Sequence, residues 1–219
     1  ATTLDLSYEY ADHERFIDRG IPTADGEPVE RFEKIVFGDE DQNLQTLTAN
    51  IMRANVSHML SDTSKINISV LSSDYEKMYQ NLYAAAYDAA TNVVTMDGYY
   101  DPTERENFMM SANLVSELDF GGMKHTILIG TEVIDTQNKN TRYDSYWITS
   151  GSDKESFIVT RPLDFSVTNL GVATAFDFAT KLKSRTESDI AVSSFYVQDQ
   201  IEVSDKVLLM LGGRIDTFD

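Results

Sequence analysis

Apolar and polar residues alternate with a period of two along most of this 219-residue chain. In residues 4–10, Leu and Tyr fill every second position, and Asp5, Ser7 and Glu9 lie between them. The side chains of a strand point alternately to its two faces, whereas a helix would scatter this pattern around its circumference. The alternation recurs in residues 65–71, 106–119, 124–135, 189–203 and 206–217. It predicts an all-β chain.

One predicted strand, residues 44–60, changes phase in its middle. Leu47 and Ile51 belong to one alternating set, whereas Val56 and Leu60 belong to the other. A β-bulge near Met52 and Arg53 would reconcile the two sets. A misplaced strand boundary would serve equally well.

The connections between the predicted strands alternate strictly between short and long. The short ones, residues 61–64, 120–123 and 204–205, are rich in Ser, Asp and Gly, which favour tight turns. The long ones span residues 12–43, 72–105 and 136–188, and residues 93–100 and 157–165 resemble short strands inside them. Short periplasmic turns and long extracellular loops are typical of an antiparallel, up-and-down transmembrane β-barrel. A soluble antiparallel sandwich is the alternative.

Composition removes several classes of function. The chain has no Cys, and its three His residues, His13, His58 and His125, are far apart, so neither a thiolate nor a His-rich metal site is indicated. No phosphate-binding loop or nucleophile motif occurs, and no catalytic residue is predicted. A net charge of −18 argues against nucleic-acid binding. No run approaches the roughly 18 apolar residues of a membrane helix.

Four stretches resemble TonB-dependent outer-membrane siderophore receptors. They are LDLSYEYADHERFIDRGIP (residues 4–22), FGDEDQN (37–43), HTILIGTEV (125–133) and SSFYVQDQIEVSDKVLLMLGGRIDTFD (193–219). The order and spacing of these stretches agree with the predicted hairpins. The resemblance covers nearly the whole chain and is weakest inside the loops.

The resemblance implies an internal piece of the receptor's barrel domain, spanning residues 1–219. About seven strands of a barrel with about 22 strands would lie here, and the plug domain and the C-terminal strands would lie elsewhere. It further implies a protein of the outer membrane that is not an enzyme and has no cofactor. Its partners would be lipid, TonB through the plug, and a ferric siderophore as the transported ligand. Haem, cobalamin or another nutrient, or a plug-less porin-like barrel, are the alternatives.

Charge and aromatic content single out candidate ligand residues in the long loops. Residues 136–188 carry slightly more basic than acidic side chains, whereas the other two loops are acidic. Aromatic rings and Arg suit planar, anionic ferric siderophores through stacking and charge-assisted hydrogen bonds. The predicted ligand-binding residues are Arg142, Tyr143, Tyr146 and Trp147, with Tyr99 and Tyr100 in the second loop. For any one of these aromatic residues, a place in a membrane-interface girdle or in hairpin packing is the competing interpretation.

Overall fold

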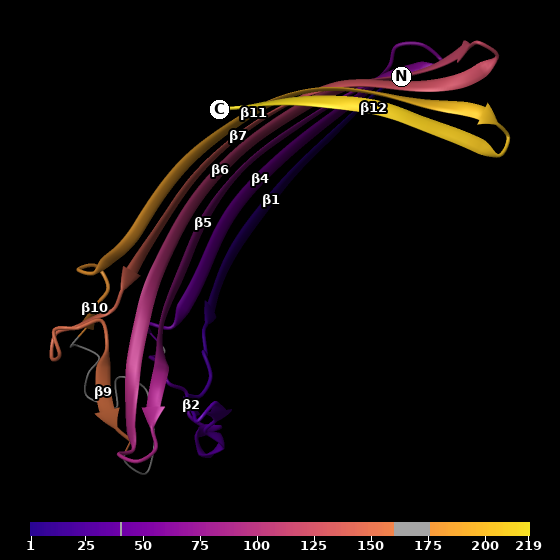
Figure 1. Cartoon of the computed structure of the whole chain (residues 1–219). Helices are drawn as coiled ribbons and strands as arrows, with labels where there is room; N and C mark the ends of the chain where they lie inside the picture. The colour runs from indigo at the N-terminus through magenta and orange to yellow at the C-terminus, as the bar shows by residue number, and fades with distance from the viewer. Residues whose placement is uncertain (40, 160–175) are drawn as a thin grey trace.

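The chain forms one long, curved antiparallel sheet with irregular segments gathered at one end (Figure 1). The computed structural model describes residues 1–39, 41–159 and 176–219. Seven long strands follow one another in the order β1-β4-β5-β6-β7-β11-β12, so strands that succeed each other along the chain also pair in space. Their bounds are β1 (Thr2–Phe16), β4 (Leu44–Met59), β5 (Ser64–Asp88), β6 (Val93–Phe120), β7 (Met123–Asp144), β11 (Leu182–Ser204) and β12 (Val207–Phe218). This arrangement confirms the predicted up-and-down topology.

Short elements lie at the end of the sheet where the long connections gather. They are β2 (Thr23–Ala24), β3 (Glu27–Pro28), the 3-10 helix η1 (Glu30–Phe32), β8 (Tyr146–Trp147), β9 (Glu155–Ile158) and β10 (Phe176–Asp177). β9 adds an eighth strand to the sheet by pairing with the start of β6. It confirms the start of the short strand predicted at residues 157–165, and residues 160–165 lie outside the described part of the chain. Within the described residues, no helix is long and apolar enough to cross a membrane.

The predicted short turns are present, but the bounds predicted for the long loops are wrong. β5 and β6 run for 25 and 28 residues, so residues 89–92 alone connect them instead of residues 72–105. β1, β7 and β11 likewise extend into the predicted loops. A barrel strand crosses a membrane in roughly 9–11 residues, so these hairpins continue well beyond it. Above the membrane both faces of a strand meet water, and the two-residue hydropathy period disappears although the backbone stays paired.

The bulge predicted near Met52 and Arg53 is also wrong. β4 pairs with β1 and with β5 through its full length without a register shift. The pairing keeps Leu47 and Ile51 on the face opposite Val56. The apolar residues themselves therefore change face along β4, and the backbone register does not shift. The register shifts of the sheet lie elsewhere, at Ala84/Ala86, Leu182/Ser184 and Glu202/Ser204.

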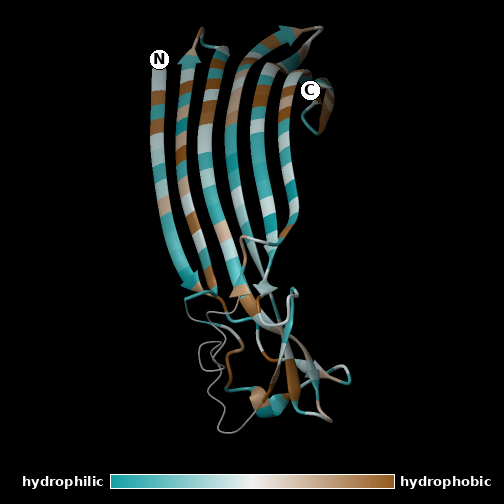
Figure 2. Ribbon diagram, turned by 90° about the vertical axis from the view of Figure 1, so that its left-hand side faces the viewer, coloured by the Kyte–Doolittle hydropathy of each residue, from teal (hydrophilic) through white to brown (hydrophobic). Residues whose placement is uncertain are grey.

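Cross-strand pairing sorts the sheet into two chemically distinct faces. One register row consists of Leu4, Val56, Ile68, Ala112, Thr131, Phe195 and Ile215. The adjacent row on the opposite face consists of Asp5, Asn55, Ser69, Ser111, Glu132, Ser194 and Asp216. We call these the outer and the inner face. Figure 2 shows the alternation as hydrophobic and hydrophilic bands along the strands.

The outer face exposes apolar side chains in the manner of a lipid-facing surface. Leu6 is 71% exposed and Ile215 is 73% exposed. On β6 the apolar band runs from Phe108 to Leu118, roughly 33 Å along the strand. A strand tilt of about 40° reduces this length to roughly 25 Å, the height of the apolar band of an outer-membrane barrel. The apolar members of the alternating pattern on β1, β5, β6 and β7 all share this face: Leu4, Leu6, Ile66, Ile68, Val70, Met110, Leu114, Ile127 and Ile129.

Asp199 interrupts the apolar residues of the outer face on β11, and it pairs with His125 on the neighbouring strand β7. The His125 Nδ1 lies at hydrogen-bond distance, 2.8 Å, from the Asp199 Oδ2. Phe120 packs edge-on against the His125 ring beside the Gly121–Gly122 turn. His125 therefore lies beside a short turn at the end of the apolar band, and a neighbouring strand supplies one of its hydrogen bonds.

The inner face carries most of the charged side chains of the sheet's lower half, and several of them form ion pairs with each other. Arg214 donates to Glu132 at 2.8 Å and to Asp216 at 2.7 Å, and Arg53 lies 3.3 Å from Glu9. Such pairs keep a charged wall compatible with a confined, water-filled or protein-filled lumen.

The side chain of Tyr196 crosses an entire strand of the inner face. Its hydroxyl donates to the Asn113 Oδ1 at 2.5 Å, two strands away, and the ring passes over Gly130 on the strand between them. A Cβ atom at position 130 would lie 2.2 Å from the Tyr196 ring. Only glycine leaves room for this cross-strand packing.

We expect Gly130→Ala to lower the free energy of unfolding by about 1–3 kcal/mol, because the added methyl group displaces the Tyr196 ring from its hydrogen bond. Denaturant titration in lipid vesicles, read by heat-modifiable gel mobility, measures the change. The double variant Gly130→Ala with Tyr196→Ala tests the cause. Its methyl group no longer meets a ring, so the two losses should be less than additive, and strict additivity would contradict this explanation.

The buried hydrophobic core lies in the clustered connections rather than between layers of the sheet. Its fully buried members include Phe32, Leu82, Val94 and Trp147. They come from the first connection, from the β5–β6 hairpin tip and from the third connection. The extracellular segments therefore pack as one unit on the extended hairpin.

Candidate functional site

The β6–β7 register determines which predicted ligand residues share a face. Pairing runs without a shift from Phe120–Met123 to Tyr99–Asp144. Odd positions of β6 therefore keep facing inward beyond the membrane, and even positions keep facing outward. Tyr99 lies on the inner face, whereas Tyr100 and its partner Tyr143 lie on the outer face.

On the inner face, three Tyr rings and two Arg side chains form what we call the inner-face cluster. It consists of Arg19, Tyr79, Tyr83, Tyr99 and Arg142. Tyr79 stacks on Tyr99 with ring centroids 5.9 Å apart, and Tyr83 meets Tyr99 edge-on at 6.2 Å. Guanidinium groups lie over these rings, Arg142 at 4.4 Å from the Tyr99 centroid and Arg19 at 4.6 Å from that of Tyr83. This arrangement presents aromatic faces and positive charge together.

The two Arg residues differ in how their charge is balanced. Arg142 makes a bidentate pair with Asp101, donating from Nε at 2.7 Å and from Nη2. Arg19 donates to the Tyr99 hydroxyl at 2.6 Å and to the Asn81 Oδ1 at 3.2 Å, both neutral groups. Among the described residues, Arg19 makes no ion pair with a carboxylate. Its charge is therefore left to act on a ligand.

Two further carboxylates near the cluster are paired with cations. Asp97 lies 3.4 Å from the Lys154 ammonium, and Asp144 lies 3.0 Å from that of Lys183. The hydrogen bond and charge of Asp144 raise the pKa of Lys183. Because these acidic groups are occupied by cations, they oppose an anionic ligand less than their number suggests.

Protonation states in the cluster suit hydrogen-bond donation. Burial, with the nearby Asp97 charge, raises the pKa of Tyr83 above its usual value, so its hydroxyl stays protonated at neutral pH. The hydrogen bond that Arg142 donates to Asp101 raises the pKa of Arg142.

Asn81 also lies at the cluster and is fully buried. Its side-chain NH₂ group has no hydrogen-bond partner in the described part of the chain.

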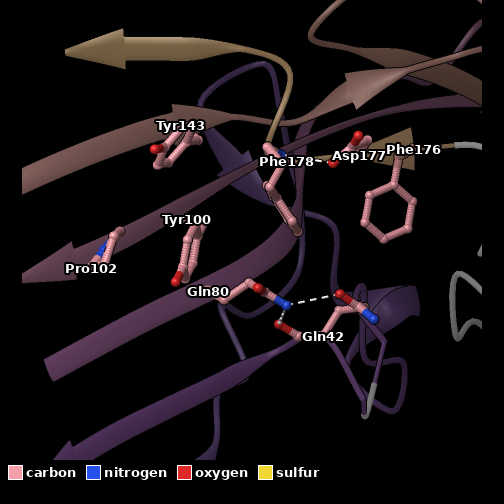
Figure 3. A pocket seen from close by; sticks show the side chains of 9 residues that line it. Gln42, Gln80, Tyr100, Pro102, Tyr143, Phe176, Asp177 and Phe178 are labelled. Carbon is pink, nitrogen blue, oxygen red and sulfur yellow. Dashed lines mark hydrogen bonds between the residues drawn. The ribbon is translucent and has the colours of Figure 1, made fainter. Parts of the chain in front are cut away.

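Tyr100 and Tyr143 lie on the opposite face, beside a surface pocket of about 480 Å³ (Figure 3). Their rings stack with centroids 5.8 Å apart. Gln42, Gln80 and Phe178 contribute to the same pocket. This pocket opens on the side of the sheet that faces lipid further down.

The remaining two predicted residues, Tyr146 and Trp147, lie in or beside the buried hydrophobic core of the connections, which we call the loop core. Trp147 is 0% exposed and packs against Phe157 and Phe176, so it offers no free ring face to a ligand. Tyr146 is half-buried and pairs with Asp177 in the β8–β10 ribbon. The structure thus brings Arg142 and Tyr99 together and separates the other four from them.

Three members of the cluster were not predicted from the sequence. Arg19 lies in the stretch that carries the family resemblance, and Tyr79 and Tyr83 lie in a segment interpreted as loop. Continuing the two-residue period from residue 105 back to residue 97 would have grouped Tyr99 with the inward set. No sequence pattern joins Arg19 to Tyr99, which is 80 residues away.

Comparison with known proteins identifies the family. The sequence model of the TonB dependent receptor-like β-barrel family matches residues 1–219, and the chain belongs to this family. Its members are outer-membrane transport receptors and not enzymes.

Individual relatives agree with the assignment. The chain is 26% identical over 234 residues to the probable TonB-dependent siderophore receptor PiuA of Acinetobacter baumannii, covering all of this chain and 31% of that protein. The crystal structure of that receptor superposes with a TM-score of 0.70 at 22% identity, covering 99% of this chain and 33% of its own. The ferripyoverdine receptor of Pseudomonas aeruginosa superposes with a TM-score of 0.73 at 15% identity, covering 99% and 28%. The open form of the ferric-catecholate import receptor Fiu of E. coli K12 gives 0.68 at 17%, covering 100% and 34%. The chain therefore spans about a third of the length of these proteins.

Proposed function

We propose that the chain is part of a receptor that takes up a ferric siderophore across the outer membrane, driven by TonB. Family membership supports this function, and so does the similarity to PiuA, the ferripyoverdine receptor and Fiu, which are named as siderophore or ferric-catecholate receptors. Residues 1–219 form one portion of the barrel domain in this proposal. The plug, the contact with TonB and the remaining strands of a barrel with about 22 strands belong to other parts of the receptor.

We further propose that the inner-face cluster contributes to the ligand-binding surface above the lumen. The observation that carries this assignment is Arg19, a cation whose hydrogen-bond partners among the described residues are neutral, held among Tyr rings on the face that lines the barrel. Such a group attracts a ligand that is anionic and partly aromatic, as ferric catecholates are. Arg142 and Tyr99 stay in the proposed ligand set, and Arg19, Tyr79 and Tyr83 join it. Tyr100, Tyr143, Tyr146 and Trp147 do not point toward this surface, and we leave them out of it.

Replacing Arg19 by Ala in the receptor that carries this segment is expected to weaken binding of a ferric tris-catecholate about tenfold, the effect of roughly 1.4 kcal/mol. The physical reason is the loss of a cation that no described carboxylate neutralises, together with its contact to two Tyr rings. Quenching of intrinsic fluorescence on titration with the complex measures the affinity of the purified receptor.

Arg15→Ala is the matched control. Arg15 lies on the same face and is exposed, but it bonds to Gln45 instead of the cluster. Equal losses in both variants would mean that overall charge attracts the ligand and that the cluster does not bind it. A neutral ferric trihydroxamate complex serves as a second probe, and its binding should depend less on Arg19.

A further inference from the structure

The outer face has three zones along the strands, which differ in the kind of side chain they expose. The lowest zone is the apolar band, which ends on β6 at Phe108. Directly above it, carboxylates face each other across strands, because Asp74 pairs with Glu106 and Glu76 pairs with Glu104. Above this acidic zone, the row that contains Gln80, Tyr100 and Tyr143 leads into the pocket shown in Figure 3.

The pocket lies too high for the acyl chains of the membrane. Tyr100 lies eight positions before Phe108 on the same strand, which corresponds to roughly 26 Å along β6. The strand tilt lowers the vertical rise to roughly 20 Å above the apolar band. This is the region that the sugars of an outer-leaflet glycolipid occupy, because its acyl chains and innermost polar groups lie below them.

The lining of the pocket combines aromatic surface with neutral hydrogen-bonding groups. The Tyr100 and Tyr143 rings form its wall, with the Phe178 ring 6.4 Å from Tyr100. Gln80 Nε2 donates to the backbone oxygen of Gln42 at 3.0 Å and to its Oε1 at 2.8 Å. The Gln80 oxygen and the Gln42 amino group make no further hydrogen bond within the described residues, so an acceptor and a pair of donors stay available.

The charges of the lining exclude other ligand classes. Among the described lining residues none is Lys or Arg, and Asp177 is the one acidic group. A phosphate or another anion would meet a carboxylate without a compensating cation. A hydroxylated ring fits this lining, because its C–H bonds can lie against the negative face of an aromatic ring while its hydroxyl groups bond to amides and a carboxylate.

We propose that this pocket binds a pyranose ring in the oligosaccharide of the outer leaflet's own glycolipid. The site goes beyond the proposed uptake function, because the pocket opens on the face opposite the inner-face cluster. A volume of about 480 Å³ accommodates a ring of this size. Binding there would couple the extracellular loops, through Phe178 of the loop core, to the sugar layer around the barrel.

The test uses the detergent-purified receptor and de-acylated core oligosaccharide, released from rough lipopolysaccharide by acid hydrolysis. Microscale thermophoresis measures the affinity. Tyr143→Ala should weaken binding at least tenfold, because it removes one wall of the pocket. Tyr75→Ala, which removes a Tyr from the inner face of β5, should leave the affinity within twofold of wild type. Equal affinities of wild type and Tyr143→Ala would overturn the proposal.

Two further measurements keep the outcome decisive. Nitration of the wild-type receptor by tetranitromethane, read by mass spectrometry, should slow at Tyr100 and Tyr143 when the oligosaccharide is present, and should not slow at Tyr75. Unchanged nitration at Tyr100 and Tyr143 would overturn the site even if the Ala variant failed to fold. A glucose oligomer of equal length is the comparison ligand, and equal binding of that oligomer would overturn the glycolipid as the source of the sugar.

Discussion

Ile68→Arg should lower barrel stability by about 2–4 kcal/mol, the cost of placing an Arg on the lipid face near the bilayer midplane. Ile68 stands in the outer row with Leu4, Val56 and Ala112, between the two ends of the apolar band. Its direct neighbours in that row, Val56 and Ala112, are apolar and offer an introduced Arg no anionic or polar partner. The guanidinium must therefore distort the bilayer or extend out of it. Guanidinium titration of the receptor in lipid vesicles, with heat-modifiable gel mobility as the readout, measures the loss.

Ser69→Arg provides the matched control, because it adds the same side chain one residue along the same strand. Ser69 faces inward, between Asn55 and Ser111, in the row that also contains Asp5 and Glu132. An Arg in that polar row should change stability by about 0.5 kcal/mol or less. If the two variants lose stability equally, the assignment of the faces is incorrect.

Asn43→Ala is the second change for which we expect a large effect, a loss of about 3–5 kcal/mol in the local stability of the extracellular segments. Asn43 is fully buried where β4 begins. Its side-chain amide donates to the Leu82 oxygen at 2.9 Å and accepts from the Leu82 N–H at 3.0 Å. It thereby continues the β4–β5 ladder beyond Leu44–Gln80 with a side chain in place of a backbone.

The same amide holds the first connection in place. It donates to the Ile17 oxygen at 3.0 Å and accepts from the Asp39 N–H at 3.2 Å. A Cβ at Gly38 would lie 2.3 Å from the Asn43 amide nitrogen, so the chain needs glycine there for the close approach. Alanine at position 43 would leave buried backbone groups of two segments without these bonds, and that loss is the source of the expected effect.

Hydrogen exchange at the Leu82 amide, together with limited proteolysis of the first connection, reports this local opening. Asn50→Ala is the control, since Asn50 lies on the same strand but bonds to Tyr8 at the exposed outer face. The control should leave both measurements unchanged. Protection of Leu82 that stays at the wild-type level in Asn43→Ala would show that the ladder extension contributes little.

Much of the candidate site could not be predicted from the sequence, and Trp147 shows why. Its position among Arg142, Tyr143 and Tyr146 suggested a ligand-binding cluster, because aromatic and basic residues lie close together in the chain. In the structure Trp147 packs against Phe157 and Phe176, Tyr143 turns outward, and Arg142 turns inward. Successive residues of a strand point to opposite faces of the sheet. Residues that are adjacent in the sequence therefore do not form one binding surface.

The sequence by itself determined the sheet. The period of two follows from backbone geometry, so it identified the strands and the apolar and polar set of each strand wherever one face meets lipid and the other does not, and the residues between these strands identified the short turns. The tertiary structure alone decided where the strands end and which residues form the site. Beyond the membrane both faces are hydrated and the hydropathy signal is lost, although pairing continues to Asp88 and Asp144. The contact of Arg19 with Tyr99 joins residues 80 positions apart, and only the cross-strand register and the packed loop core bring them together.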